Sequence, residues 1–277
     1  MPPIDPSLAL SEFILSHPRL LVLTGAGIST DSGIPDYRDG KGEWKRKQPV
    51  QHPQFLRCQD TRKRYWGRSL AGWPRLRDAD PNRAHAALAW LEQRGNLELL
   101  VTQNVDGLHQ RAGSKRVIDL HGRADHVICI RCEFSCSREQ MHQRCAASNP
   151  TFSSLPAATA PDGDADLEVD FSTFHVPDCP ACGGILKPDV VFFGDSVPKP
   201  RVADALHALR RADGLLVIGS SLMVYSGFRF CRHAQEWNKP IVALTLGRTR
   251  ADPLLSLKLD APITPVLQAA TALLGAH

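Results

Sequence analysis

The run Leu20-Leu21-Val22-Leu23-Thr24 leads directly into Gly25-Ala26-Gly27-Ile28-Ser29-Thr30, and this junction decides the fold. A short, uniformly apolar run that ends at glycine predicts a buried strand. Glycines in the turn after a strand let backbone amides approach a pyrophosphate, and the helix start that follows favours negative charge. Thr30 occupies the third position of the dinucleotide fingerprint, so the loop alone fits an ordinary tight turn as well as a nucleotide site.

Three further apolar runs have the length of strands: Leu97–Thr102, Leu215–Gly219 and Ile241–Leu246. Between them, Ala84–Gln93 and Pro200–Ala212 have the apolar spacing of helices. Strands that alternate with helices in this way predict an α/β fold with a Rossmann-like, doubly wound parallel sheet.

Two stretches interrupt this alternation. Residues 44–81 are rich in Trp, Arg and Pro and are expected to form a helical or loop insertion, and residues 126–185 are expected to form a smaller zinc-binding lobe. The large lobe of a single catalytic domain would then comprise residues 1–43, 82–125 and 186–277. Within the small lobe, residues 146–176 are acidic and rich in Ser, Pro and Ala, which predicts a mobile surface excursion.

The composition limits the possible partners. The chain has 277 residues, a net charge of +4 and a pI near 8.7, which suits a soluble protein that binds anions such as nucleotides. There is no dense run of Lys and Arg, so specific nucleic-acid binding is not expected. Apolar runs are far shorter than the roughly 20 residues of a membrane span, and no secretory signal is evident. Eight cysteines without such a signal predict thiols or metal ligands in a reducing, cytoplasmic compartment. Oligomeric state cannot be read from these features.

Cysteines form two pairs with the spacing of zinc knuckles, Cys129-x-x-Cys132 and Cys179-x-x-Cys182. Two residues between ligands let both thiolates face one ion, and four thiolates complete a tetrahedral site with no open position, so the zinc would be structural. The alternative is unligated cysteine. Because Cys136 and Cys145 are also candidates, the first pair is less firmly assigned than the second.

Several motifs occur in order over residues 20 to about 263. They comprise Gly25–Arg38, Thr102–His109, His121–Gly122, the cysteine pairs, Lys187–Asp195 and Gly219–Val224. In these motifs and their order the sequence resembles the sirtuin family. The patterns Val224-Tyr225-Ser226-Gly227 and Gly247-x-Thr249-Arg250 most resemble the class II branch.

The resemblance implies an NAD-dependent protein-lysine deacetylase or deacylase, whose partners are acylated lysine side chains of proteins. The acyl group would pass to ADP-ribose with release of nicotinamide, His121 would be the general base, and Asn104 and Asp106 would help to hold the carboxamide. An ADP-ribosyltransferase that uses the same cleft is the alternative. The residues implied to bind NAD are Gly25, Ala26, Gly27, Ser29, Thr30, Asp36, Tyr37, Arg38, Gln103, Asn104, Val105, Asp106, Gly219, Ser220, Ser221, Thr245, Leu246, Gly247 and Ile263.

The chemistry of these residues is consistent with the resemblance. Gln103, Asn104 and Asp106 follow a predicted strand, so they would project at the carboxyl edge of the sheet, although Asx residues also shape ordinary turns. His121 follows the short predicted strand Arg116–Leu120 and could accept a proton near neutral pH, but a lone histidine is more often structural. A nicotinamide oxidoreductase would not explain these residues, and a zinc interaction module would explain only residues 129–182.

The implied substrate residues are Val191, Phe192, Phe193 and Gly194; the substrate backbone would lie as an added strand between this loop and the region Ser226–Phe228. Tyr65-x-x-Arg68 resembles a pair that receives acyl chains ending in a carboxylate; alternatively, Tyr65 packs the insertion and Arg68 reaches solvent. Two positions depart from the family pattern. Thr245 replaces a common Asn, which predicts a weaker adenosine contact, and Ile263 lies near a frequent Cys, where contact through the backbone would make the change mild.

Overall fold

The computed structural model describes residues 5–45, 49–152, 158–159, 165–167 and 169–276. Its larger lobe is built on a six-stranded parallel sheet. In spatial order the strands are β11 (Leu257–Leu259), β10 (Ile241–Leu244), β9 (Gly214–Ile218), β1 (Leu20–Thr24), β2 (Leu97–Thr102) and β3 (Val117–Asp119). The order runs outward in both directions from β1, as in a doubly wound fold.

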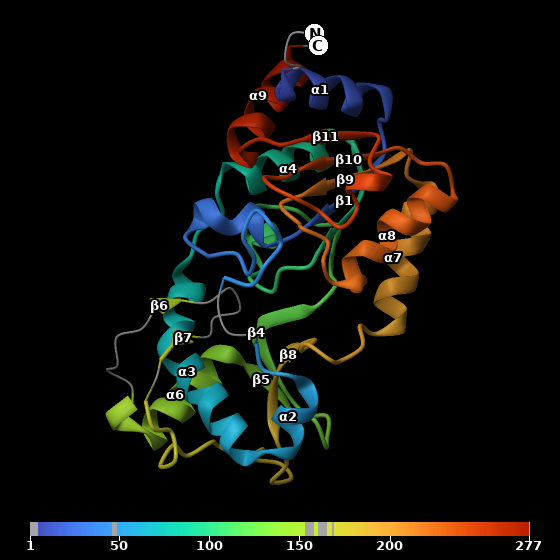
Figure 1. Ribbon diagram of the computed structural model, residues 1–277. Coiled ribbons are helices and arrows are strands. Elements are labelled where there is room, and N and C mark those ends of the chain that lie inside the picture. The colour runs from blue at the N-terminus through green and yellow to red at the C-terminus, as the bar shows by residue number, and fades with distance from the viewer. Residues whose placement is uncertain (1–4, 46–48, 153–157, 160–164, 168, 277) are drawn as a thin grey trace.

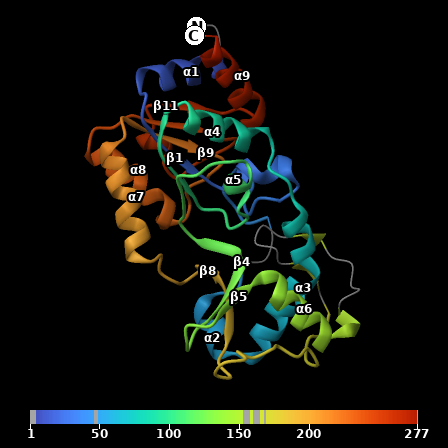
Figure 2. The same cartoon turned by 180° about the vertical axis from the view of Figure 1, so that it is seen from behind.

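Helices cover both faces of this sheet (Figures 1 and 2). On one face lie α1 (Pro6–Ser16), α4 (Arg83–Gln93) and α9 (Ile263–Gly275), and on the other lie α7 (Lys199–Arg211) and α8 (Tyr225–Glu236). Three short helical segments, η1 (Ala26–Ser32), α5 (Leu108–Arg111) and η3 (Asp252–Leu254), lie in the connections.

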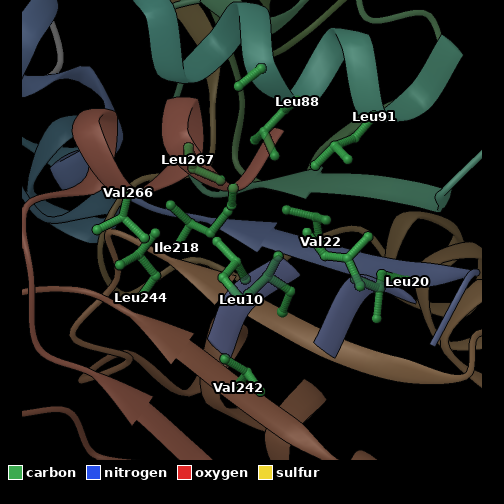
Figure 3. Close-up of a cluster of buried hydrophobic side chains, with 14 of the residues drawn as sticks. Leu10, Leu20, Val22, Leu88, Leu91, Ile218, Val242, Leu244, Val266 and Leu267 are labelled. Carbon is green, nitrogen blue, oxygen red and sulfur yellow. The ribbon is translucent and has the colours of Figure 1, made fainter. Parts of the chain in front are cut away.

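The central position of β1 in the sheet explains why residues 20–23 are all apolar. Leu20 and Val22 pack toward α1, α4 and α9 (Figure 3), whereas Leu21 and Leu23 pack toward α7 and α8. All four side chains have no exposed surface. A strand covered on both faces has no position for a polar residue until its end, where the site begins.

The predicted strands and helices are confirmed, with bounds that differ by at most two residues. Three helices that cover the sheet were not predicted, α1, α8 and α9. Of these, α1 and α9 pack against each other and complete the core around Leu10 and Leu267. Ile263 is the first residue of α9, and it packs against this core.

The smaller lobe combines the predicted insertion with the cysteine-bounded segment. It contains α2 (His52–Arg57), α3 (Gln59–Asp78), α6 (Arg138–Ser148), η2 (Pro150–Phe152), a three-stranded antiparallel sheet of β5 (Ser135–Ser137), β4 (Gly122–Cys129) and β8 (Leu186–Val190), and the short pair β6 (Ala158–Thr159) and β7 (Ala165–Asp166). Trp66 of α3, Met141 of α6 and Leu186 of β8 share one buried cluster. The insertion is therefore helical and forms part of this lobe's core.

The prediction of a mobile surface excursion at residues 146–176 is wrong at both ends of the segment. Phe171 and Phe174 are buried against Phe152, and the Asn149 side chain donates to the carbonyl groups of Cys145 and His175. The apolar residues of this acidic segment therefore belong to the core of the smaller lobe. Residues 153–157, 160–164 and 168 lie outside the described residues.

No helix in the described ranges combines the length and the apolar composition that crossing a membrane requires.

Candidate active site and metal centre

A cleft of about 810 Å³ lies at the carboxyl ends of β1, β2, β9 and β10, with a wall contributed by the smaller lobe. Most of the residues predicted from the sequence line it. These are Gly25, Ala26, Gly27, Ser29, Asp36, Tyr37, Arg38, Tyr65, Gln103, Asn104, Val105, Asp106, His121, Val191, Phe192, Phe193, Gly194, Gly219, Ser220, Ser221, Thr245 and Leu246.

Glycines bring two of the cleft loops into direct backbone contact. The Gly27 amide donates to the Gly219 carbonyl at 2.9 Å, and a Cβ on Gly27 would lie 2.9 Å from the Gly219 Cα. A Cβ on Gly25 would lie 2.7 Å from the Ser220 Cβ. Side chains at these positions would force the loops after β1 and β9 apart, so the glycines fix the floor of the cleft.

A buried polar network follows β2. The Asn104 amide donates to the Gly25 carbonyl at 3.2 Å and to the Ser29 Oγ at 3.0 Å, while Ser29 in turn donates to Asp106 Oδ2 at 2.8 Å. The Leu108 backbone amide donates to the other Asp106 oxygen. Burial raises the pKa of the Asp106 carboxyl, although these donors act in the opposite direction. The network holds an amide and a carboxylate together at the end of β2.

His121 has both ring nitrogens engaged. Nδ1 lies 2.9 Å from the Gln103 carbonyl, which can only accept, so Nδ1 carries the proton. In the neutral ring Nε2 then has the lone pair, and it accepts from the Ser226 hydroxyl at 2.8 Å. Burial lowers the pKa of His121 to about 4; the Gln103 hydrogen bond opposes this effect, and the positive charges of Arg201 and Arg229 add to it. At neutral pH the ring is uncharged and can act as a base.

The Arg38 side chain contacts an aromatic ring and a backbone carbonyl group. Its guanidinium lies 4.0 Å from the centre of the Trp44 ring and donates to the Gly42 carbonyl at 2.7 Å. No carboxylate in the described ranges forms an ion pair with it. Arg38 therefore presents a positive charge within the cleft.

Sequence reasoning missed several cleft residues: Ile34, Trp44, Val50, Arg229 and Arg248. Trp44 and Val50 belong to the segment read only as an insertion, and no local pattern indicated that they would turn toward the nucleotide loop. Ile34 lies within the predicted motif Gly25–Arg38, and Arg229 lies two positions after the motif Val224–Gly227. This proximity was the signal in the sequence that could have indicated them.

Four predicted residues are not among those that line the cleft. Thr30 donates to the Gly27 carbonyl within its own turn, and Ile263 packs against the core at the start of α9. Gly247, with φ of +79°, is held by close approach to Gly40. Arg68 of α3 is not among the lining residues, although Tyr65, three positions earlier on the same helix, is one of them.

The four paired cysteines form a cluster in which all sulfur atoms lie within 4.8 Å of one another. The Sγ atoms of Cys129 and Cys182 are 3.6 Å apart, and those of Cys132 and Cys179 are 3.7 Å apart. Tetrahedral zinc with bonds of about 2.3 Å requires sulfur atoms about 3.8 Å apart, whereas a disulfide requires about 2.0 Å. The cluster therefore fits one structural zinc ion with four protein ligands.

Cys136 lies on β5 outside this cluster. We expect Cys136→Ser to keep the wild-type zinc content, because none of the four ligand positions changes. Elemental analysis of the purified variant beside wild type checks this. Loss of zinc from Cys136→Ser would mean that the first ligand pair is assigned to the wrong cysteines.

Comparisons with known proteins agree with this geometry. The family model described as Sir2 family matches residues 25–226. An NAD-dependent protein deacetylase of Xanthomonas campestris pv. campestris (strain 8004) is 60% identical over 91% of this chain and 86% of its own length. An NAD-dependent protein deacetylase of Bordetella bronchiseptica is 56% identical over 94% of this chain and 95% of its own length. The mitochondrial NAD-dependent protein lipoamidase sirtuin-4 of Bos taurus is 51% identical over 94% and 84%, respectively.

Solved structures extend the similarity to three dimensions. A complex of Sir2 with a p53 peptide and NAD+ has a TM-score of 0.79 at 29% identity, covering 99% of this chain and all (100%) of that chain. A Sir2 variant with a deacetylated p53 peptide and 3'-O-acetyl ADP ribose has a TM-score of 0.78 at 29% identity, covering 96% and 97%. The chain belongs to the Sir2 family.

Proposed function

We propose that the chain is an NAD-dependent protein-lysine deacylase, which transfers an acyl group from lysine to ADP-ribose and releases nicotinamide. The observation that carries this proposal is the neutral imidazole of His121 in the same cleft as the Asn104–Ser29–Asp106 network. The names of the bacterial relatives and the NAD+ and peptide bound in Sir2 structures support the same activity.

The residues of the cleft fit NAD. The loop after β1 and the loop at Gly219–Ser221 are held close by glycines and would contact the phosphates, with Arg38 as a counter-charge. Thr245 and Leu246 would contact the adenosine, and Asn104 and Asp106 would hold the carboxamide. When bound, NAD supplies the ribose that accepts the acyl group and nicotinamide as the leaving group.

In the reaction, the chain's own residues would provide a base, His121, that accepts a proton from the ribose. The Gln103 carbonyl fixes the proton of His121 on Nδ1, so Nε2 is the atom that would accept the proton of a ribose hydroxyl. The low pKa of the free ring suits a group that must be uncharged when the substrate arrives. The smaller lobe would close the other side of the cleft and exclude water.

The substrate would bind between two loops that face each other across the cleft. Residues 191–194 lie on one side and residues 224–226 on the other, and both line the same cavity. We propose that the substrate backbone lies between them as an added strand, with the acyl-lysine directed inward. The Val191 amide donates to the His121 carbonyl at 2.8 Å, which places this loop beside the base.

For the acyl group we propose a neutral chain. Tyr65 is 6% exposed and packs against Phe55 and Phe192 at the cleft wall, an apolar environment in which a carboxylate would be costly. Arg68, the cation that a carboxylate would need, is not part of that wall. The name of the bovine relative, a lipoamidase, supports a neutral acyl chain longer than acetyl.

We expect the wild-type protein to use acetyl- and lipoyl-lysine peptides at least tenfold more efficiently than succinyl- or glutaryl-lysine peptides, because an unpaired buried carboxylate costs more than about 1.4 kcal/mol. Arg68→Ala should change kcat/KM for all of these peptides by the same factor. A selective loss of the acidic substrates in this variant would restore the carboxylate-binding role of Arg68.

Three further proposals concern the domain organisation, the location and the branch of the family. We propose that residues 1–43, 82–125 and 186–277 form the NAD-binding lobe of a single catalytic domain, apart from the parts of β4 and β8 in these ranges, which belong to the sheet of the smaller lobe. We also propose that the protein is a cytoplasmic member of the class II branch. None of the eight cysteines, all of which lie in the described residues, forms a disulfide, as expected in a reducing compartment, which supports the location. The Val224–Gly227 and Gly247–Arg250 patterns support the branch.

The direct test incubates the protein with NAD and an acetyl-lysine peptide. Deacylation predicts equal amounts of free lysine peptide, nicotinamide and acyl-ADP-ribose. ADP-ribosyl transfer would instead label a protein with ADP-ribose and leave the peptide acetylated. Absence of both products would overturn the proposed function.

A further inference from the structure

Ser226 makes a contact that the reaction described above does not use. It is the second residue of α8, it lines the cleft, and its hydroxyl donates to Nε2 of His121 at 2.8 Å. This is the nitrogen that must accept a proton during the reaction. The hydroxyl therefore lies where it can affect the base both before and after proton transfer.

After proton transfer, both ring nitrogens of His121 carry hydrogen and both need an acceptor. Nδ1 already donates to the Gln103 carbonyl. The charged groups that act on the ring are Arg201 of α7 and Arg229 of α8, and both disfavour the imidazolium. No carboxylate of the described residues is hydrogen-bonded to the ring. The Ser226 oxygen is thus the acceptor within reach of Nε2.

We propose that Ser226 is a positioning residue for the general base, donating to the neutral imidazole before the reaction and accepting from the imidazolium after it. The inference rests on the proposed deacylase function. The transferred proton moves from the ribose hydroxyl to Nε2, and the serine hydroxyl keeps its own proton and only rotates. A hydroxyl can fill both roles because it is a donor and an acceptor.

The proposal predicts which step depends on Ser226. Hydrogen bonds to charged groups are stronger than those between neutral groups, so the hydroxyl stabilises the imidazolium more than the neutral ring. Ser226→Ala should therefore slow deacylation by roughly five- to tenfold. Release of nicotinamide precedes the use of the base, so exchange of labelled nicotinamide into NAD, measured with the acetyl-lysine peptide, should stay within about twofold of wild type.

Rescue by a conservative variant separates positioning from structural damage. Ser226→Thr keeps the hydroxyl at the same position of the helix and should restore deacylation to within about twofold of wild type. Ser226→Ala should keep the KM for NAD unchanged. Equal losses of exchange and deacylation in Ser226→Ala, or no rescue by Ser226→Thr, would overturn the proposal.

A measurement in the absence of NAD tests the Ser226–His121 hydrogen bond independently of the proposed deacylase activity. Nitrogen-15 NMR of histidine-labelled protein, assigned with His121→Ala, reports hydrogen bonding at each ring nitrogen. We expect the Nε2 signal of His121 to move toward that of an unbonded nitrogen in Ser226→Ala, with the protonated Nδ1 signal unchanged. An unmoved Nε2 signal would overturn the contact even if deacylation occurs; a moved signal in a protein without deacylase activity would refute only the proposed function.

Discussion

His121→Ala is expected to lower the rate of deacylation by roughly 100- to 10,000-fold, the range that a positioned general base contributes. The expectation rests on the tautomer: the Gln103 carbonyl holds the proton at Nδ1, and Nε2 is the basic atom that faces the cleft. Alanine removes both hydrogen bonds of the ring but takes no apolar contact from any of the core clusters. Steady-state deacylation of an acetyl-lysine peptide measures the loss.

The variant should retain its fold and its cofactor. NAD binding, measured by calorimetry, should stay within a few-fold of wild type, because the nucleotide contacts proposed above come from other residues. Thermal unfolding should change by only a few degrees. His121→Gln is the matched control, since it keeps a polar side chain of similar size without a basic nitrogen, and it should lose deacylation to the same extent. Wild-type-like turnover in either variant would remove His121 from the mechanism.

The sequence predicted the large lobe well because its strands are covered on both faces. Residues 20–23 must be apolar at every position, and that pattern is visible without any knowledge of its neighbours. The smaller lobe was harder to predict. Tyr65 and Trp66 pack against residues more than a hundred positions away, such as Leu186, so their local pattern indicated only a helix or a loop.

The site residues also differ in whether the sequence alone could place them. Residues that directly follow a strand, such as Asn104, could be placed at the edge of the sheet from the sequence. Arg68 and Ile263 could not, because their orientation depends on how α3 and α9 are rotated against the rest of the molecule. Ser226 was named only as part of a motif and a substrate region. Its contact with His121 depends on where α8 begins relative to a turn 105 positions earlier in the chain.

Cys179→Ser is expected to reduce the zinc content from about one ion per chain to nearly none and to abolish deacylation. A structural zinc site contributes on the order of 10 kcal/mol to the folding of the segment that holds it. The loss of zinc should also affect catalysis, because two strands connect the zinc site with His121 and the substrate loop. β4 runs from Gly122, next to His121, to the ligand Cys129, and β8 runs from Leu186, four residues after Cys182, back to the substrate loop.

These strands pair at both ends, with Gly122 opposite Val190 at the cleft and Cys129 opposite Leu186 at the zinc site, and the register shifts between Gly122 and Val127. Zinc therefore fixes one end of a two-stranded unit whose other end carries the base and the substrate loop. Metal removal should consequently weaken binding of the acyl peptide more than binding of NAD, whose contacts lie mainly in the large lobe. Calorimetry with each ligand, before and after chelation, separates the two effects, and Cys58→Ser, an exposed cysteine outside the cluster, is the matched control. Full stability and activity in protein that elemental analysis finds free of metal would defeat the structural role of the zinc.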